Sequence, residues 1–202
     1  TEQPEYNGTQ LIHSKVIASY LRQLLRNDLQ YAPFRMEGME QDVREMMEID
    51  TPQGKLALQI GGTIDRLDSK GDTLRIVDYK TGGTPKTPEN IEQLFTPADN
   101  RPNYIFQTFL YAAILCRKQS LKVAPSLLYI HRAASESYSP VIEMGAPRQP
   151  KVPVNNFAFF EDEFRERLHG LLQEIFSQEE TFSQTEDTRK CEYCDFRSLC
   201  KR

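Results

Sequence analysis

The sequence lacks any long apolar run, and it lacks a strong excess of charge of either sign. No stretch reaches the roughly 18 uncharged apolar residues that a membrane span needs, and the polar N-terminus TEQPEYNGTQ does not have the pattern of a secretion signal. Among 202 residues, 25 Lys and Arg stand against 29 Asp and Glu, a net charge of −4, so no global basic field indicates nucleic acid. Any such binding would depend on local basic groups and bound metal. We expect one cytoplasmic domain without membrane contact.

Cysteine is also scarce, with four residues, but three of them fall in the last twelve positions. In an intracellular chain, such cysteines are more often thiols or metal ligands than disulfides. The spacing Cys191-x2-Cys194-x5-Cys200 is typical of a metal site. The alternative is a tail with three unpaired surface thiols. Cys116 lies in an apolar stretch, which favours a small packed core residue.

Hydrophobic periodicity indicates an α/β domain with a central mixed β-sheet and flanking helices. The elements expected are helices at 10–27, 103–118 and 157–176, strands at 56–67, 73–80, 125–132 and 137–144, extended chain at 34–49 and an irregular loop at 81–102. Pro140 marks the last of these strands as an edge strand. The regions expected are an N-terminal helix (1–30), a core (31–183) and a cysteine-rich segment (184–202) that returns to the core.

The segment 56–80 predicts a β-hairpin whose register brings two acidic residues together. If Gly71 and Asp72 form the two-residue turn, Asp65 lies opposite Asp78. Opposed side chains have Cβ atoms about 4.5–5.5 Å apart, and like charges at that separation are destabilising. Because strand side chains alternate, Lys80 projects from the same face as Asp78. Two carboxylates and one ammonium therefore converge on one point.

That convergence suits metal-dependent chemistry on a phosphodiester. Carboxylates are ligands for Mg²⁺ or Mn²⁺, whose charge would relieve the repulsion, and a metal so held lowers the pKa of a bound water. The lysine ammonium can hold the attacking water or stabilise negative charge at phosphorus. The simpler alternative is a solvated ion-pair cluster on an exposed sheet face, because a lone D-x-K pattern is common.

Two motifs resemble the RecB/AddB-like nucleases of the PD-(D/E)XK superfamily. Residues 62–68 (GTIDRLD) and 76–82 (IVDYKTG) are similar to their G-x-x-D-R-x-D and D-Y-K-T-G signatures, and 107–111 (QTFLY) is similar to their Q-x-x-x-Y element. The resemblance covers residues 34–202. It implies catalytic roles for Asp65, Asp78 and Lys80, with the two aspartates and the backbone carbonyl of Tyr79 as metal ligands.

Other residues near these motifs are candidates for supporting roles. Gln107 and Tyr111 share one helix face, where they would bind DNA phosphate or brace the lysine, unless they are only a polar pair on a packing helix. Residues close enough in sequence to contact phosphates are Arg66, Lys86, Arg101 and Gln107.

The resemblance also makes His13 and Glu40 candidates for further metal ligands. The family has a histidine before the core in a G-x3-H context, whereas Gly8 to His13 is G-x4-H. His13 is therefore expected either to reach the site or to be a buried packing residue with the true ligand upstream. Glu40 is a candidate for an acidic position that precedes the G-x-x-D strand.

The same resemblance gives the cysteines a role. AddB-like nucleases hold a [4Fe–4S] cluster with C-x2-C-x5-C and one distant upstream cysteine. Cys116 follows the hairpin, so the fourth ligand is missing here, and a start at Thr1 suggests a fragment of a longer chain. We expect the cluster in the full-length protein, its absence from this fragment, and a loosely held chain after Gln184.

The function expected is Mg²⁺- or Mn²⁺-dependent DNA hydrolysis, by an exonuclease rather than an endonuclease. The resemblance implies the nuclease domain of an AddB-like helicase–nuclease in double-strand break processing and recombination. Its partners would be DNA, a helicase region of the same chain and an AddA-like subunit. The chain has no nucleotide-binding loop, so ATP-driven unwinding would belong to that other region. The alternatives are a catalytically silent DNA-binding or scaffolding module and a standalone phage-type exonuclease.

Overall fold

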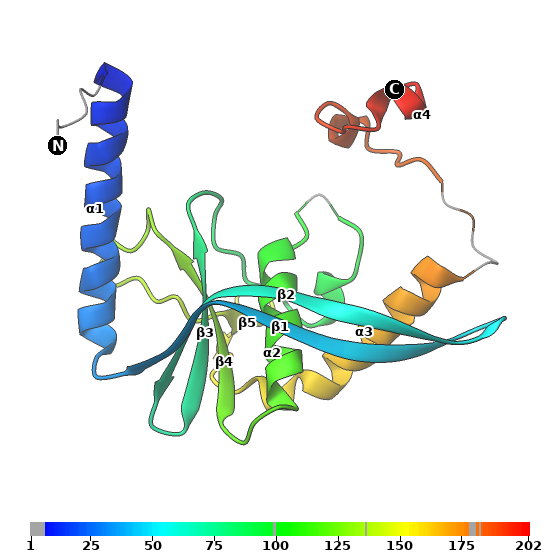
Figure 1. Ribbon diagram of the computed structural model, residues 1–202, viewed down its shortest axis with the longest axis horizontal. Helices are drawn as coiled ribbons and strands as arrows, with labels where there is room; N and C mark the ends of the chain where they lie inside the picture. The colour runs from blue at the N-terminus through cyan, green and yellow to red at the C-terminus, as the bar shows by residue number, and fades with distance from the viewer. Residues whose placement is uncertain (1–6, 99, 136, 178–180, 182) are drawn as a thin grey trace, which may run out of the picture.

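A four-stranded mixed sheet forms the centre of the protein (Figure 1). The computed structural model describes residues 7–98, 100–135, 137–177, 181 and 183–202. The strands lie in the order β1-β2-β3-β4, with the first two pairs antiparallel and the last pair parallel. Their bounds are β1 Arg35–Thr51, β2 Gly54–Lys70, β3 Thr73–Lys80 and β4 Lys122–Tyr129. The prediction of a mixed sheet with flanking helices is confirmed.

Strands β1 and β2 form a long hairpin that extends beyond the rest of the sheet (Figure 1). Strand β2 has 17 residues but pairs with β3 only from Arg66 to Lys70. The two long strands approach closely at Gly61, where φ is +146° and an added Cβ would lie 2.0 Å from the carbonyl oxygen of Val43. Only glycine fits there. Before Arg66, β2 pairs only with β1, so β2 and β3 separate next to the Arg66–Val77 pair. We call this point the fork of the sheet.

Helices cover both faces of the sheet. Helix α2 (Asn103–Cys116) and helix α3 (Glu161–Phe176) enclose the larger core, where Phe109, Phe157 and Phe164 pack ring against ring. The smaller cluster on the other face is Val77, Leu128, Ile130 and Ala133, against which helix α1 (Gly8–Tyr31) packs with Tyr20 and Leu24. Strands β3 and β4 are consequently covered on both faces, which explains their nearly continuous burial.

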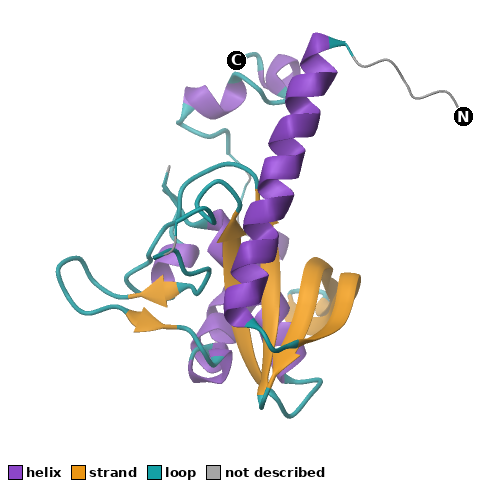
Figure 2. Cartoon of the chain, turned by 90° about the vertical axis from the view of Figure 1, so that its left-hand side faces the viewer, coloured by secondary structure: helices purple, strands orange, loops and turns teal. Residues whose placement is uncertain are grey.

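Helix α1 packs less than its sequence pattern predicts. Asn7 and Gln10 form a capping box at its start. Of the predicted apolar face, only Tyr20 and Leu24 are partly buried, whereas Ile12, Val16, Ile17, Leu21 and Leu25 are 42–63% exposed. The helix projects past the sheet (Figure 2), so its N-terminal half has no described neighbour to pack on.

The elements after α2 differ from the expected ones in extent. Strand β4 begins at Lys122 and ends before His131, and the expected strand at 137–144 shrinks to β5 (Glu143–Met144), paired with β6 (Val152–Pro153). Pro140 interrupts the pairing, since it has no N–H to donate. The remaining short elements are 3₁₀ helices η1 Glu92–Leu94, η2 Phe157–Phe159 and η3 Thr188–Cys191, and α4 Arg197–Cys200.

The cysteine-rich segment does not return to the core as expected. In Figure 1 it lies apart from the sheet, and neither η3 nor α4 has a buried residue. Its apolar side chains Tyr193, Phe196 and Leu199 are 66–89% exposed. Among the described residues, no helix is long and apolar enough to cross a membrane.

Candidate active site

The turn between β2 and β3 sets the register of the site. Gly71 adopts a φ of +61°, as a two-residue hairpin turn requires, and Asp72 forms an exposed ion pair with Lys122 at 2.6 Å. The ladder then pairs residues from Lys70–Thr73 to Arg66–Val77. This is the register predicted from the sequence, and the next position along it brings Asp65 next to Asp78.

Asp65 and Asp78 lie at the fork where the two strands separate. Because β2 turns away there, the backbone N–H of Tyr79 has no strand partner on that side and donates instead to Asp65 Oδ2 at 2.8 Å. Asp78 is 3% exposed, and burial raises the pKa of its carboxyl, to which the nearby charge of Asp65 adds. The structure thus brings together the two carboxylates that the sequence pattern paired.

Lys80 occupies the same face and is held on three sides. Its Nζ lies 2.6 Å from Asp78 Oδ2, 3.3 Å from Gln107 Oε1 and 4.2 Å from the centre of the Tyr104 ring. Gln107 is held in turn, because its Nε2 donates to the Tyr111 hydroxyl at 3.0 Å. Of the two roles expected for Gln107 and Tyr111, their contacts fit the bracing of the lysine.

Gly62 lets β2 pass beneath Tyr111. An added Cβ at this glycine would lie 2.7 Å from the Tyr111 hydroxyl oxygen, closer than a side chain can sit. The first position of the G-x-x-D motif therefore requires glycine for a steric reason. Without a side chain there, the tyrosine that braces Gln107 can approach the strand.

Burial dominates the electrostatics of Asp78. It raises the pKa of this carboxyl, Lys80 opposes the rise, and Asp65 adds to it. The Lys80 ammonium lies 2.6 Å from the buried Asp78 Oδ2, and no other donor reaches this oxygen in the described structure. A buried, incompletely satisfied carboxylate beside a second carboxylate fits a divalent cation.

The protein supplies few ligands for that cation. In the described parts of the chain, no group of three or more His, Cys, Asp or Glu side chains could hold a metal ion. An ion held by the two carboxylates would therefore need backbone carbonyl or water oxygens to complete its coordination shell. Mg²⁺ commonly keeps several bound waters in this way.

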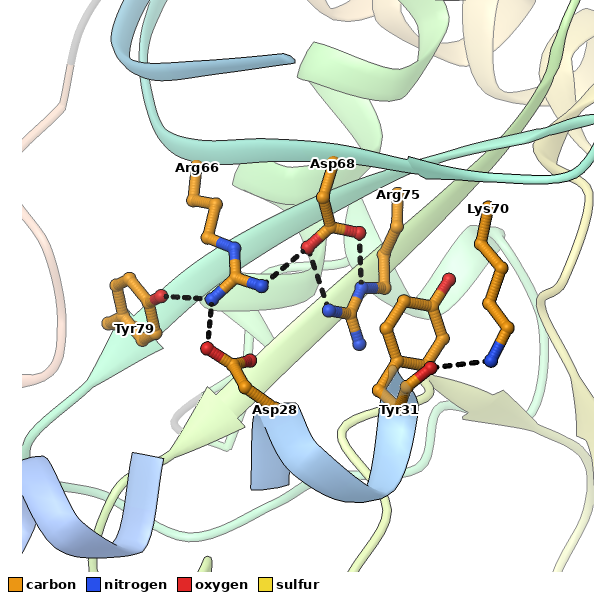
Figure 3. Close-up of polar contacts among 7 residues, drawn as sticks. All are labelled: Asp28, Tyr31, Arg66, Asp68, Lys70, Arg75 and Tyr79. Atoms are coloured by element: carbon orange, nitrogen blue, oxygen red, sulfur yellow. Dashed lines mark hydrogen bonds and ion pairs between the residues drawn. The ribbon is translucent and has the colours of Figure 1, made fainter. Parts of the chain in front are cut away.

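The opposite face of the same strands holds a buried ionic network under α1 (Figure 3). Arg66 donates to Asp28 Oδ2 at 2.8 Å and to the Tyr79 hydroxyl at 3.1 Å, and it lies 2.9 Å from Asp68. Arg75 also donates twice to Asp68, at 2.9 and 2.7 Å. The expectation that Arg66 contacts phosphate is wrong, because its side chain is 3% exposed and points away from the acid pair.

The other sequence candidates lie at varying distances from the site. His13 is exposed in the N-terminal half of α1, so it is not a buried packing residue. Glu40 is exposed and has a φ of +46°, and it lies opposite Asp65, since its neighbours Met39 and Gln41 pair with Arg66 and Ile64. Lys86 donates to the backbone carbonyls of Asn100 and Arg101, at 2.8 and 3.2 Å, and so closes the loop after β3.

Sequence reasoning missed Tyr104, whose ring lies over the Lys80 ammonium. The sequence did contain an indication of this position. Tyr104 precedes Gln107 by three residues, and residues at that spacing share a helix face. Only the folded chain shows that this face meets the end of β3.

The four cysteines are separate thiols. Cys116 packs against the larger core, as expected, and burial raises the pKa of its thiol to about 11. Cys191, Cys194 and Cys200 form no metal-binding group in the part of the chain that the structure describes.

The structure thus places an acid pair and a lysine together at the fork of a mixed α/β sheet. The chain matches the PD-(D/E)XK nuclease superfamily over residues 2–201 and therefore belongs to that superfamily. Nucleases of this superfamily are generally metal-dependent and typically use divalent ions. No curated protein matches the chain.

Proposed function

We propose that the protein is a metal-dependent deoxyribonuclease whose reaction centre is Asp65, Asp78 and Lys80. The observation that carries this proposal is the buried Asp78 carboxylate, which lies beside Asp65 and only 2.6 Å from the Lys80 ammonium. A solvated ion-pair cluster would be exposed, whereas Asp78 and Lys80 side chains are 5% and 15% exposed. The membership in a nuclease superfamily supports the same chemistry.

Asp65 and Asp78 would hold Mg²⁺ or Mn²⁺, with the Tyr79 backbone carbonyl as a further ligand. When bound, the ion would neutralise phosphate charge and acidify a water molecule. Lys80 orients the attacking water and stabilises the negative charge that develops on the phosphoryl oxygens. Gln107 fixes the ammonium through Oε1, and Tyr111 fixes Gln107, so the lysine is positioned before substrate binds.

The finer assignment is the nuclease domain of an AddB-like helicase–nuclease that degrades DNA ends as an exonuclease in the cytoplasm. It is supported by the two signature motifs, by the Gln107–Tyr111 pair in contact with Lys80, and by the C-x2-C-x5-C spacing near the C-terminus. Its partners would be a helicase region of the same chain and an AddA-like subunit. The cysteines would contribute to a [4Fe–4S] cluster in the full-length protein.

The test is cleavage of matched single- and double-stranded DNA with and without Mg²⁺, using Asp78→Ala. We expect this variant to lose its metal-dependent cleavage, because one of the two carboxylates that would hold the divalent ion is removed. Asp72→Ala is the matched control, since Asp72 lies in the exposed turn of the same hairpin. Metal-dependent cleavage by Asp78→Ala at the wild-type rate would contradict the assignment.

Lys80→Ala separates catalysis from metal binding. An ammonium is not a ligand for Mg²⁺, so kcat should fall while the Mg²⁺ concentration for half-maximal activity changes little. An equal loss of both would give Lys80 a structural role. A chain that binds DNA but never cleaves it with any divalent ion would instead be the silent DNA-binding module.

A further inference from the structure

A hollow of about 290 Å³ opens beside Lys80, and none of the roles above uses it. Its walls come from the loop after β3, the first turn of α2 and the end of β4. The residues that matter most are Gly83, Lys86, Arg101, Pro102, Tyr104 and Tyr129. These elements meet at the edge of the sheet where β3 delivers Lys80, so the hollow adjoins the reaction centre.

Two aromatic rings line this hollow. Tyr104 is 42% exposed, and its ring is in contact with the Lys80 ammonium. Tyr129 is buried, and burial raises the pKa of its phenol to about 12, so this wall stays uncharged next to Asp78. The hollow therefore offers flat apolar surface with a fixed position relative to the lysine.

Gly83 keeps the Tyr104 ring accessible. Its φ is +78°, and an added Cβ would lie 3.3 Å from Tyr104 Cε2 and 3.9 Å from Tyr129 Cε1. A side chain at this position would lie over the tyrosines and narrow the hollow. The glycine both permits the turn after β3 and leaves the exposed Tyr104 ring uncovered on this side.

Positive charge lines the same hollow. Lys86 is anchored by its Nζ to two backbone carbonyls, and Arg101 Nε donates to Asn103 Oδ1 at 2.8 Å, so both side chains are held in place. Among the described residues that line the hollow, none is acidic. The combination of aromatic faces and fixed cations matches a nucleotide, which carries a flat base and an anionic phosphate.

We propose that this hollow binds one unpaired nucleobase of the DNA strand being cleaved, stacked on Tyr104, with its flanking phosphate near Lys86 and Arg101. A base inside a duplex has both faces covered by its neighbours, so only an unpaired or extruded base can enter. The protein therefore acts on single strands or on ends that open before cleavage. The inference rests on the proposed function, because it takes DNA as the substrate.

The experiment measures binding without cleavage. Short single-stranded oligonucleotides, each with one abasic residue at a different position, are titrated in EDTA and followed by fluorescence anisotropy. The proteins are the wild-type chain, Tyr104→Leu, which loses the ring, and Tyr104→Phe, which keeps it. Circular dichroism and the unfolding temperature confirm that the variants fold.

For the wild type and Tyr104→Phe, we expect one or two abasic positions to weaken binding by roughly 5- to 150-fold, the range for one stacked base. Tyr104→Leu should bind the intact oligonucleotide more weakly, and the abasic residue should cause it no further loss. Equal abasic effects in all three proteins, or none at any position, would overturn the proposal.

Cleavage of the intact oligonucleotide with Mg²⁺ is measured in parallel, so that the two proposals can fail separately. Coupling between Tyr104 and one base without cleavage would support the base site and contradict the nuclease assignment. Cleavage without such coupling would contradict the base site alone.

Discussion

Asp78 is the side chain whose environment departs most from that of an ordinary carboxylate. It lies on a strand covered on both faces, next to Asp65, and its ionised form loses much of its hydration. Lys80 compensates only in part, because burial and Asp65 together keep the pKa raised. A divalent ion would remove the remaining electrostatic cost, so metal binding and protonation compete at this residue.

We expect stabilisation by Mg²⁺ to grow as pH rises. The pKa of Asp78 is raised in the folded protein above its ordinary value of 3.8, so without metal its favourable contribution is present below that value. That contribution is lost as pH rises through the raised pKa. The increase in unfolding temperature caused by Mg²⁺ should therefore be small near pH 4 and larger towards neutral pH. The measurement is thermal unfolding with and without Mg²⁺ across this range.

Asp78→Asn is the control for that titration, since the amide cannot ionise. Its Mg²⁺-induced change in unfolding temperature should be small and should not rise with pH in the same way. A pH-independent effect of Mg²⁺ in the wild type would mean that Asp78 is not a ligand.

The cysteines should differ in reactivity. Burial raises the pKa of the Cys116 thiol to about 11, so near pH 8 almost none of it is thiolate. Cys194 is exposed. Alkylation by iodoacetamide at this pH, followed by mass spectrometry of the peptides, should modify Cys194 far faster than Cys116. Equal rates in the folded protein would contradict the packing of Cys116.

At the scale of the elements, the β2–β3 hairpin was the most predictable part of the fold. Its turn residues and its alternation are local, so the sequence determined both the register and the face shared by Asp78 and Lys80. The same alternation places Arg66 on the other face, but its partner Asp28 lies 38 residues away. Such a distant contact has no local signal, which is why its proximity in sequence to Asp65 was misleading.

Arg66 should therefore affect stability rather than DNA binding. We expect Arg66→Met to reduce the free energy of unfolding by about 3 kcal/mol, because Asp28 and the Tyr79 hydroxyl lose a buried partner. Arg44→Met is the matched control, since Arg44 pairs with Asp42 on the exposed surface of the neighbouring strands. Its effect should be within about 0.5 kcal/mol. Denaturant unfolding measures both values.

A DNA-binding measurement on Arg66→Met tests the alternative role of this residue. If Arg66 contacted a phosphate, Arg66→Met would lower DNA affinity and reduce the salt dependence of binding by about one unit of slope, with little change in stability.

At the scale of the whole molecule, the mixed sheet and the order of its main helices followed from periodicity. The packing of the two ends of the chain did not follow from periodicity. Amphipathic spacing predicts that α1 has an apolar face, but not whether another element covers it, and Leu21 and Leu25 are exposed. Cysteine spacing likewise predicts a metal site without showing whether the segment folds against the core.

Removing residues 184–202 should leave the core nearly as stable as before. The helices in that segment bury no residue, so the loss of burial is small. We expect the unfolding temperature to change by less than about 2 °C, which corresponds to under about 1 kcal/mol for a domain of this size. Differential scanning calorimetry measures the change, and a large decrease would show that the segment docks on the core in solution.

The two-sided burial of β3 has a consequence for how this chain can change in length. Asp78 and Lys80 face α2, whereas Val77 and Tyr79 face α1. One residue inserted between Gly71 and Asp78 would exchange these faces, so that carboxylate and ammonium enter the apolar cluster beneath α1. Insertions and deletions are therefore confined to the connections around this strand, such as the loop from Thr81 to Pro102, while the strand itself can vary only by substitution.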